Sequence, residues 1–174
     1  MNNAVKWGVI GGIGVILVDT LLYLVDPVNI MGGLSYVEWL VYIPVMIKAG
    51  IDDKNDAGGY MTWGEALKPT YLTFVIASLF YVVYMYAMYN IIDPGLADIQ
   101  RDASMEMIEG MADFMGEEAT EQMIAGMEGQ EFGLTFGRAA LTFGWRLLFP
   151  GFVFAAICSL IVRRNPPDDL ALDN

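Results

Sequence analysis

Hydrophobic residues are concentrated in four long stretches of the chain, at about residues 7–25, 34–51, 69–92 and 139–162. A helix that crosses the hydrocarbon core of a bilayer needs about 20 mostly apolar residues, and each stretch is close to that length. A soluble surface helix would carry a polar face opposite its apolar stripe, whereas residues 74–88 are apolar all round. The pattern therefore predicts an all-α membrane protein, a four-transmembrane-helix antiparallel bundle that forms a single membrane domain over residues 1–174.

The composition narrows the chemistry that the chain can perform. Of its 174 residues 56% are hydrophobic, none is histidine, and the one cysteine, Cys158, lies in the fourth stretch. A single cysteine forms no disulfide within the chain, and without histidine the usual proton shuttle at neutral pH is missing. We expect no catalytic residue, metal or cofactor. The apolar run after Lys6 exceeds a signal-peptide core, and no small-x-small motif follows Val25, so we expect an uncleaved first span.

Positive charges indicate how the chain threads through the membrane. If the four spans alternate in direction, six basic residues fall on one side: Lys6, Lys48, Lys54, Lys68, Arg163 and Arg164. The opposite side receives residues 26–33 and 94–137, where Arg101 is the one basic residue, and Arg138 begins the fourth span at that face. Because positive residues are retained in the cytoplasm, we expect a multi-pass membrane protein with both termini cytoplasmic.

The segment at residues 94–137 is strongly acidic. Its net charge is −9, because Arg101 opposes ten acids: Asp98, Asp102, Glu106, Glu109, Asp113, Glu117, Glu118, Glu121, Glu128 and Glu131. Such a segment repels phosphate, so nucleic acid is not an expected partner. No proline interrupts residues 96–127, and apolar residues recur there at helical spacing. The pattern predicts an extra-cytoplasmic amphipathic helical segment between spans 3 and 4, divided by its glycines into two short helices.

Methionines dominate the apolar face of this segment: Met105, Met107, Met111, Met115, Met123 and Met127. Thioethers suit Cu(I), so a soft-metal site is one interpretation. The other is an amphipathic helix that rests on the bundle with methionine as adaptable filler. We favour the second, because no histidine or cysteine lies in the segment.

The second connection, residues 52–69, has a sequence that resembles a calcium loop only in part. An EF-hand that starts at Asp53 would find suitable residues at Asn55 and Gly58, but Ala57 and Gly64 stand where oxygen ligands are needed. We expect instead a turn at the two glycines and a helix capped by Thr62, with Glu65 completing a capping box. Tyr60 and Trp63 are expected at the level of the lipid headgroups.

The same connection carries a recognisable motif. Residues 58–66 read Gly-Gly-Tyr-x-Thr-Trp-Gly-Glu-Ala, and the third stretch ends in Tyr-x-x-Ile-Asp-Pro at residues 89–94. These motifs resemble those of the bacterial domain-of-unknown-function family 4199, small four-span membrane proteins common in Bacteroidota. The resemblance covers nearly the whole chain. It implies the four-span fold and a location in the bacterial inner (cytoplasmic) membrane, but no activity. The family-like inner-loop residues are Gly58, Gly59, Tyr60, Gly64 and Glu65.

Three ionisable residues lie inside the predicted spans: Asp19, Glu38 and Arg146. From the rise of a helix, each is roughly 6 to 10 Å below the same membrane surface. Charges within a membrane are costly and are functional candidates by default. One interpretation is an ion or proton relay, or a site for a small charged ligand. The other, which we favour, is a structural ion pair of Asp19 with Arg146, with Glu38 as a second acceptor.

Small residues predict how the spans pack. Gly8 and Gly12 form a small-xxx-small pattern in the first span. In the fourth span Gly137, Gly144 and Gly151 recur every seven residues, with Ala140 and Ala155 on the same face, away from Arg146. The fourth span is therefore expected to lie between two partners or to present one face to another subunit. Pro44 and Pro150 are expected to kink the second and fourth spans.

These features favour a non-enzymatic accessory or structural subunit of a membrane complex. The alternative is a small transporter or ion-conducting protein that uses Asp19, Glu38 and Arg146. An enzyme ranks third, because the sequence shows no nucleophile–base pair, metal cluster or phosphate loop. The expected partners are the lipid bilayer and either another membrane protein or further copies of the chain.

Overall fold

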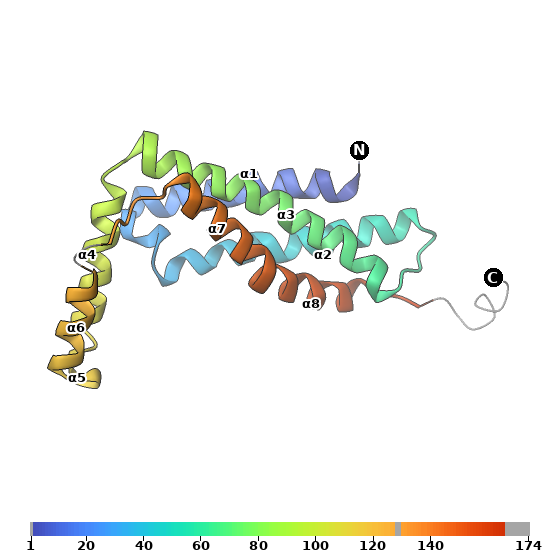
Figure 1. The fold of residues 1–174 in the computed structure, drawn as a ribbon. Coiled ribbons are helices and arrows are strands. Elements are labelled where there is room, and N and C mark those ends of the chain that lie inside the picture. The colour runs from blue at the N-terminus through green and yellow to red at the C-terminus, as the bar shows by residue number, and fades with distance from the viewer. Residues whose placement is uncertain (1, 128–129, 166–174) are drawn as a thin grey trace.

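The computed structural model describes residues 2–127 and 130–165, and it confirms the all-α fold. Four helical stretches are long and apolar enough to cross a membrane: Asn3–Val25, Gly33–Asp56, Trp63–Ile92 and Phe136–Val162. They run side by side as an antiparallel bundle (Figure 1). Its main helices are α1 (Asn3–Val25), α2 (Trp39–Asp56), α3 (Trp63–Ala87), α7 (Phe136–Arg146) and α8 (Phe152–Val162).

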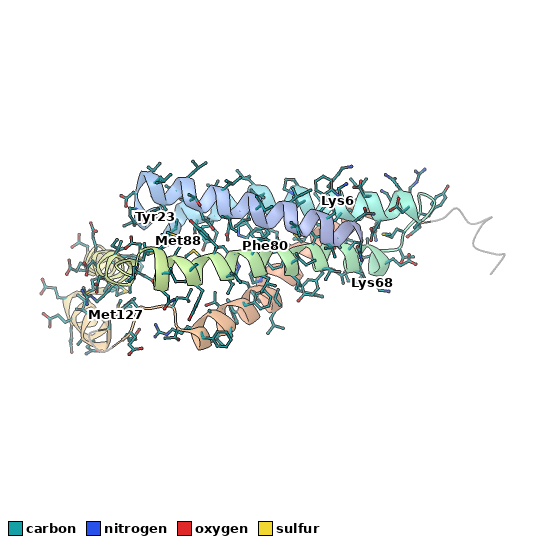
Figure 2. All side chains as sticks on the ribbon, turned by 90° about the horizontal axis from the view of Figure 1, so that it is seen from above. Lys6, Tyr23, Lys68, Phe80, Met88 and Met127 are labelled. Atoms are coloured by element: carbon teal, nitrogen blue, oxygen red, sulfur yellow. The ribbon has the colours of Figure 1, made fainter. Side chains whose placement is uncertain are left out.

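One end of the bundle, which we call the terminal end, carries the start of α1, the α2–α3 connection and the end of α8. The side-chain amide of Asn3 donates to Asp53 and Asp56 at 2.8 and 2.7 Å. Met61 and Arg164 exchange two backbone hydrogen bonds of 2.9 Å, an isolated bridge in a structure whose described residues form no named strand. Lys6 and Lys68 lie toward this end, whereas Tyr23 and Met88 lie toward the opposite one (Figure 2).

Glycines allow α1 to approach its neighbours closely. A Cβ added to Gly8 would come within 2.7 Å of Ile76, and one added to Gly12 within 2.6 Å of Phe80, both on α3. Without a hydrophobic driving force in lipid, such close contact of small residues is what stabilises a helix pair. The predicted packing face of the first span is therefore confirmed.

The fourth span is interrupted by η4, a π-helical turn at Leu147–Gly151 that contains Pro150. Proline removes a backbone donor and clashes with the preceding turn, and the regular helix gives way to a π-helical turn there. Pro44 lies inside α2, which stays helical on both sides of it. The kinks expected at the two prolines stay predictions. Gly151 packs closely against Phe74, but a Cβ at Gly137 or Gly144 would meet open space. The predicted glycine face is thus split between the bundle core and the outer surface.

The acidic segment projects from the other end of the bundle (Figure 1), which we call the hairpin end. It forms three helices, α4 (Leu96–Glu109), α5 (Ala112–Met115) and α6 (Glu117–Met127), rather than the two expected. Gly116 has a φ of +86°, a left-handed conformation that glycine adopts without steric cost and that turns the chain between α5 and α6. Glu128 lies outside the described residues.

The methionine face does not rest on the bundle, so that expectation is wrong. Leu96, at the start of α4, is buried in a cluster with Ile30 and Met88. Farther along, α4 packs against α6, and Met107 is 64% exposed. The reason is geometric, because Pro94 and Gly95 end the third span in a turn that directs α4 away from the bundle (Figure 1).

Candidate functional site

Glu38 and Arg146 both lie where a regular helix changes its geometry. Glu38 is the last residue of η2 (Gly33–Glu38), a short 3-10 helix that leads into α2. Arg146 ends α7 just before the π-helical turn. Asp19 lies in the second half of α1. The three residues therefore come from three different spans, in the half of the bundle nearer the hairpin end.

The guanidinium of Arg146 is held by two neighbouring helices. Its Nη2 atom donates to Glu38 Oε1 at 2.8 Å and to the hydroxyl of Tyr42 at 3.2 Å. Its Cζ atom lies 4.0 Å from the ring centroid of Tyr81 and 5.6 Å from that of Tyr42. An ion pair, a charge-assisted hydrogen bond to a hydroxyl and two cation–π contacts thus compensate for the loss of water around this charge.

Asp19 does not pair with Arg146, so the expected order of partners is wrong. Asp19 is 1% exposed, and its Oδ2 atom has no hydrogen-bond partner among the described residues. It is near enough for the charges of Glu38 and Arg146 to act on it. The depth of a residue along a helix can be counted from the sequence. The direction of the Glu38 side chain could not be predicted in this way, because η2 changes the helical rotation just before α2. The structure brings the three residues together with Glu38, rather than Asp19, as the ion-pair partner.

Three further polar residues of this cluster were missed in the sequence. Tyr42 and Tyr81 contact Arg146, and Ser78 is buried with its hydroxyl unpartnered among the described residues. The signal was present in the spacing. Tyr42 is four residues after Glu38, and Tyr81 is three residues after Ser78, so each pair shares a helix face. We refer to Asp19, Glu38, Tyr42, Ser78, Tyr81 and Arg146 as the charge cluster.

An apolar layer separates the charge cluster from the terminal end. Val15, Met46 and Phe74 are fully buried in one core cluster. Each lies four residues, about one helical turn, toward the terminal end from Asp19, Tyr42 or Ser78. Beyond the layer, Thr70 and Thr73 donate to backbone carbonyls of their own helix. Among the described residues, no hydrogen bond links Thr70 or Thr73 to the charge cluster.

The family-like loop forms part of the terminal end and is remote from the charge cluster. Gly58 and Gly59 have φ values of +87° and +90°, which turn the chain. Thr62 and Glu65 form the predicted capping box. The guanidinium of Arg164 lies 5.3 Å from the ring centroid of Tyr60. Gly64 has open space around it. These residues join the α2–α3 connection to the end of the fourth span.

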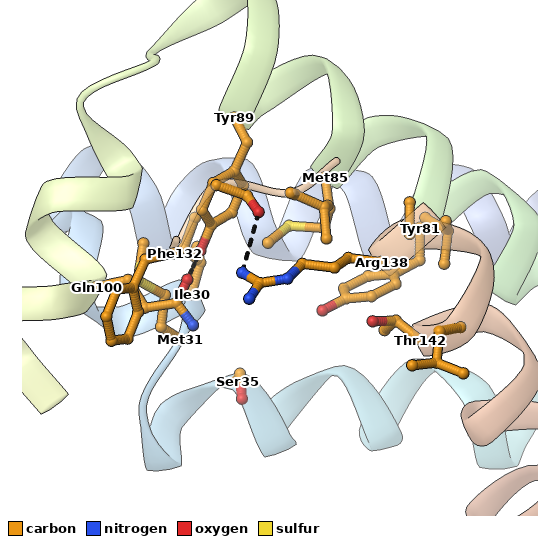
Figure 3. Close-up of a pocket in the computed structure, with 15 residues that line it drawn as sticks. Ile30, Met31, Ser35, Tyr81, Met85, Tyr89, Gln100, Phe132, Arg138 and Thr142 are labelled. Carbon is orange, nitrogen blue, oxygen red and sulfur yellow. Dashed lines mark hydrogen bonds between the residues drawn. The ribbon is translucent and has the colours of Figure 1, made fainter. Parts of the chain in front are cut away.

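A cavity of about 390 Å³ opens at the hairpin end, next to the charge cluster (Figure 3). Tyr81 belongs to both, since it contacts Arg146 and also lines the cavity. The hydroxyl of Tyr89 donates to Gln100 Oε1 at 2.7 Å across the cavity wall. We call this space the hairpin-end cavity. Its lining residues include Ile30, Met31, Ser35, Tyr81, Met85, Tyr89, Gln100, Phe132, Arg138, Leu141 and Thr142.

The described residues contain no group of three His, Cys, Asp or Glu side chains that could hold a metal ion. A model of the family described as "Protein of unknown function (DUF4199)" matches residues 6–164 of the chain. No curated protein and no solved structure matches it.

Proposed function

We propose that this chain, which belongs to the DUF4199 family, is a non-enzymatic accessory or structural subunit of the bacterial inner membrane. The apolar layer of Val15, Met46 and Phe74 carries this proposal. An ion that crossed the bundle would have to leave the charge cluster and pass three fully buried apolar side chains without a polar partner. The cost of placing a charge in such surroundings is high. The interior of the bundle thus favours a structural role over the conduction of ions.

The projecting segment α4–α6 supports an accessory role. Phe114 is 92% exposed, and Met107 and Met123 are also exposed on the same segment. Apolar side chains that lie beyond the hydrophobic length of the bundle are unfavourable in water and favour contact with another protein. The acidic charge of the segment favours a basic partner over nucleic acid. The partner is either another membrane protein or a second copy of this chain.

The alternative function, a small transporter or ion-conducting protein, is supported by one observation. Asp19 is a buried carboxylate without a hydrogen-bond partner for Oδ2, and unpaired ionisable groups in membranes often mark ion pathways. In that function Asp19, Glu38 and Arg146 would bind the transported ion, and the apolar layer would have to open.

Two measurements on the same preparation separate these functions. The accessory role predicts that the chain, extracted from native membranes in a mild detergent, elutes with a partner in stoichiometric amount. It also predicts no ion flux when the purified chain is placed in liposomes. Phe114→Ser is expected to reduce recovery of the partner, whereas Tyr36→Ser, an exposed aromatic off the projecting segment, is the matched control. A lone oligomer that conducts ions, and loses conductance in Asp19→Asn, would establish the transporter instead.

We also propose that both termini are cytoplasmic. The basic side chains Lys6, Lys48 and Lys54 contact Trp7, Asp52 or Val162 at the terminal end, and Arg164 contacts Tyr60 there. This clustering agrees with the positive-inside rule. Reporter fusions at Gly116 and after Asn174, a residue outside the described part, are expected to report opposite sides. Reporters on the same side would contradict the four-span topology.

A further inference from the structure

The hairpin-end cavity carries a positive charge in the most acidic region of the chain. Arg138 is the charged residue in its described lining, and no Asp or Glu lines it. The neighbouring segment, residues 94–137, has a net charge of −9. A cavity that excludes carboxylates in such surroundings, and contains a guanidinium, is complementary to an anion.

The guanidinium of Arg138 is positioned for such a ligand. Its Nη1 atom faces the backbone carbonyls of Glu131 and Gly133, to which it donates. None of the hydrogen bonds or ion pairs found among the described residues involves its Nη2 or Nε atoms. Figure 3 shows the guanidinium inside the cavity, with the hydroxyls of Tyr81 and Thr142 on the surrounding walls. The arginine fork and these two hydroxyls are donors suited to the oxygens of a phosphate.

The rest of the lining is apolar and reaches the outer surface of the bundle. Met31 and Met85 line the cavity, as does Leu141, which is 75% exposed. Arg138 is the third residue of the fourth span, Phe136–Val162. It therefore lies at one limit of the hydrophobic length, which is the depth of lipid headgroups. The cavity combines an anion-binding group at headgroup depth with an apolar wall that continues onto the lipid-facing surface.

We propose that the hairpin-end cavity binds the phosphate of an anionic phospholipid from the surrounding leaflet. The phosphate accepts hydrogen bonds from Arg138, and the acyl chains lie along Leu141 on the outside of α7. The volume of about 390 Å³ accommodates a headgroup rather than a whole lipid. A free anion from the aqueous phase would have to pass the acidic segment, whereas a lipid enters sideways from the bilayer. This proposal is independent of the accessory role.

The test uses the full chain in a neutral detergent, with short-chain phosphatidylglycerol or phosphatidylcholine added below its micellar concentration. Binding is followed by native mass spectrometry. Phosphatidylcholine carries the same phosphate, but its quaternary ammonium cancels that charge and is repelled by Arg138, so we expect one phosphatidylglycerol to bind more tightly than phosphatidylcholine. Arg138→Gln should weaken phosphatidylglycerol binding by about tenfold, the effect of losing a charge-assisted hydrogen bond. Arg138→Lys should keep part of the preference. Arg101→Gln, which removes the same charge from exposed α4, should keep all of it.

Three results would overturn the proposal. The first is equal binding of the two lipids to the parent chain. The second is an equal loss in Arg138→Gln and Arg101→Gln, which would reflect overall charge rather than the cavity. The third is displacement of phosphatidylglycerol by millimolar inorganic phosphate, which would identify a site for a free anion. Thr142→Leu, which adds bulk to the cavity wall, is expected to reduce lipid binding while Arg138 is intact.

Discussion

Arg146 donates to Glu38 across 2.8 Å, although 108 residues separate them in the chain. The contact joins the end of α7 to the start of α2, and both side chains are largely buried. Buried ion pairs contribute little net stability, but removing one member leaves the other as a buried charge without compensation. The pair therefore acts as a lock on the relative position of the second and fourth spans.

This lock is expected to give non-additive effects on stability. Arg146→Met and Glu38→Gln should each lower the free energy of unfolding by about 3–5 kcal/mol, because each leaves a buried group without its partner. The double variant should lose much less than the sum. Thermal unfolding of the purified chain in detergent measures all three. Additive losses would mean that the two residues do not interact in the folded protein.

Asp19→Asn is expected to behave differently from Glu38→Gln. Asp19 has no partner for its Oδ2 atom among the described residues, and the ion pair of Arg146 is with Glu38. Asp19→Asn removes a buried, ionisable group without deleting an ion pair, so the variant should unfold at the same temperature as the parent chain or at a higher one. A loss as large as that of Arg146→Met would show that Asp19 is the true partner of the arginine.

The spans, the capping box and the packing face of α1 could be predicted because each depends on local order in the sequence. Hydrophobic length identifies a span, and Thr62 with Glu65 three residues later identifies a helix start. The partner of Arg146 could not be predicted in this way. It depends on a 3-10 helix before α2 and a π-helical turn after α7, and both alter the direction of side chains without altering the apolar pattern.

The position of the acidic segment could not be predicted from the sequence either. Its methionines indicated an apolar face, but not what that face would meet. The structure packs α4 against α6 and directs both away from the bundle. The hairpin-end cavity follows from this arrangement, since Gln100 of α4 and Arg138 of α7 line it together. Contacts between segments so far apart are set by the turn after the third span.

The methionines of α4–α6 are expected not to form a tight copper site. Met107 and Met123 are exposed, and the segment offers no histidine or cysteine to complete a soft coordination sphere. Titration of the purified chain with Cu(I) against a competing chelator should show no stoichiometric binding. A site that binds one equivalent and is lost in the double variant Met111→Leu with Met115→Leu would instead identify the segment as a metal-binding element.

Close packing of α1 on α3 gives a matched pair of glycine substitutions. In Gly12→Ala the new Cβ would lie 2.6 Å from Phe80, so the helices must separate or the ring must move. Overpacking of this kind typically costs about 1–3 kcal/mol. Gly144→Ala makes the same chemical change on α7, where the added methyl meets open space. Because alanine is more favourable in a helix than glycine by up to about 1 kcal/mol, this variant should be as stable as the parent chain or slightly more so.

Thermal unfolding in detergent compares the two variants directly. Equal stability of both variants would show that α1 and α3 do not pack as closely as the structure indicates. A loss confined to Gly144→Ala would instead place the tight helix contact on α7, against a second copy of the chain or another subunit.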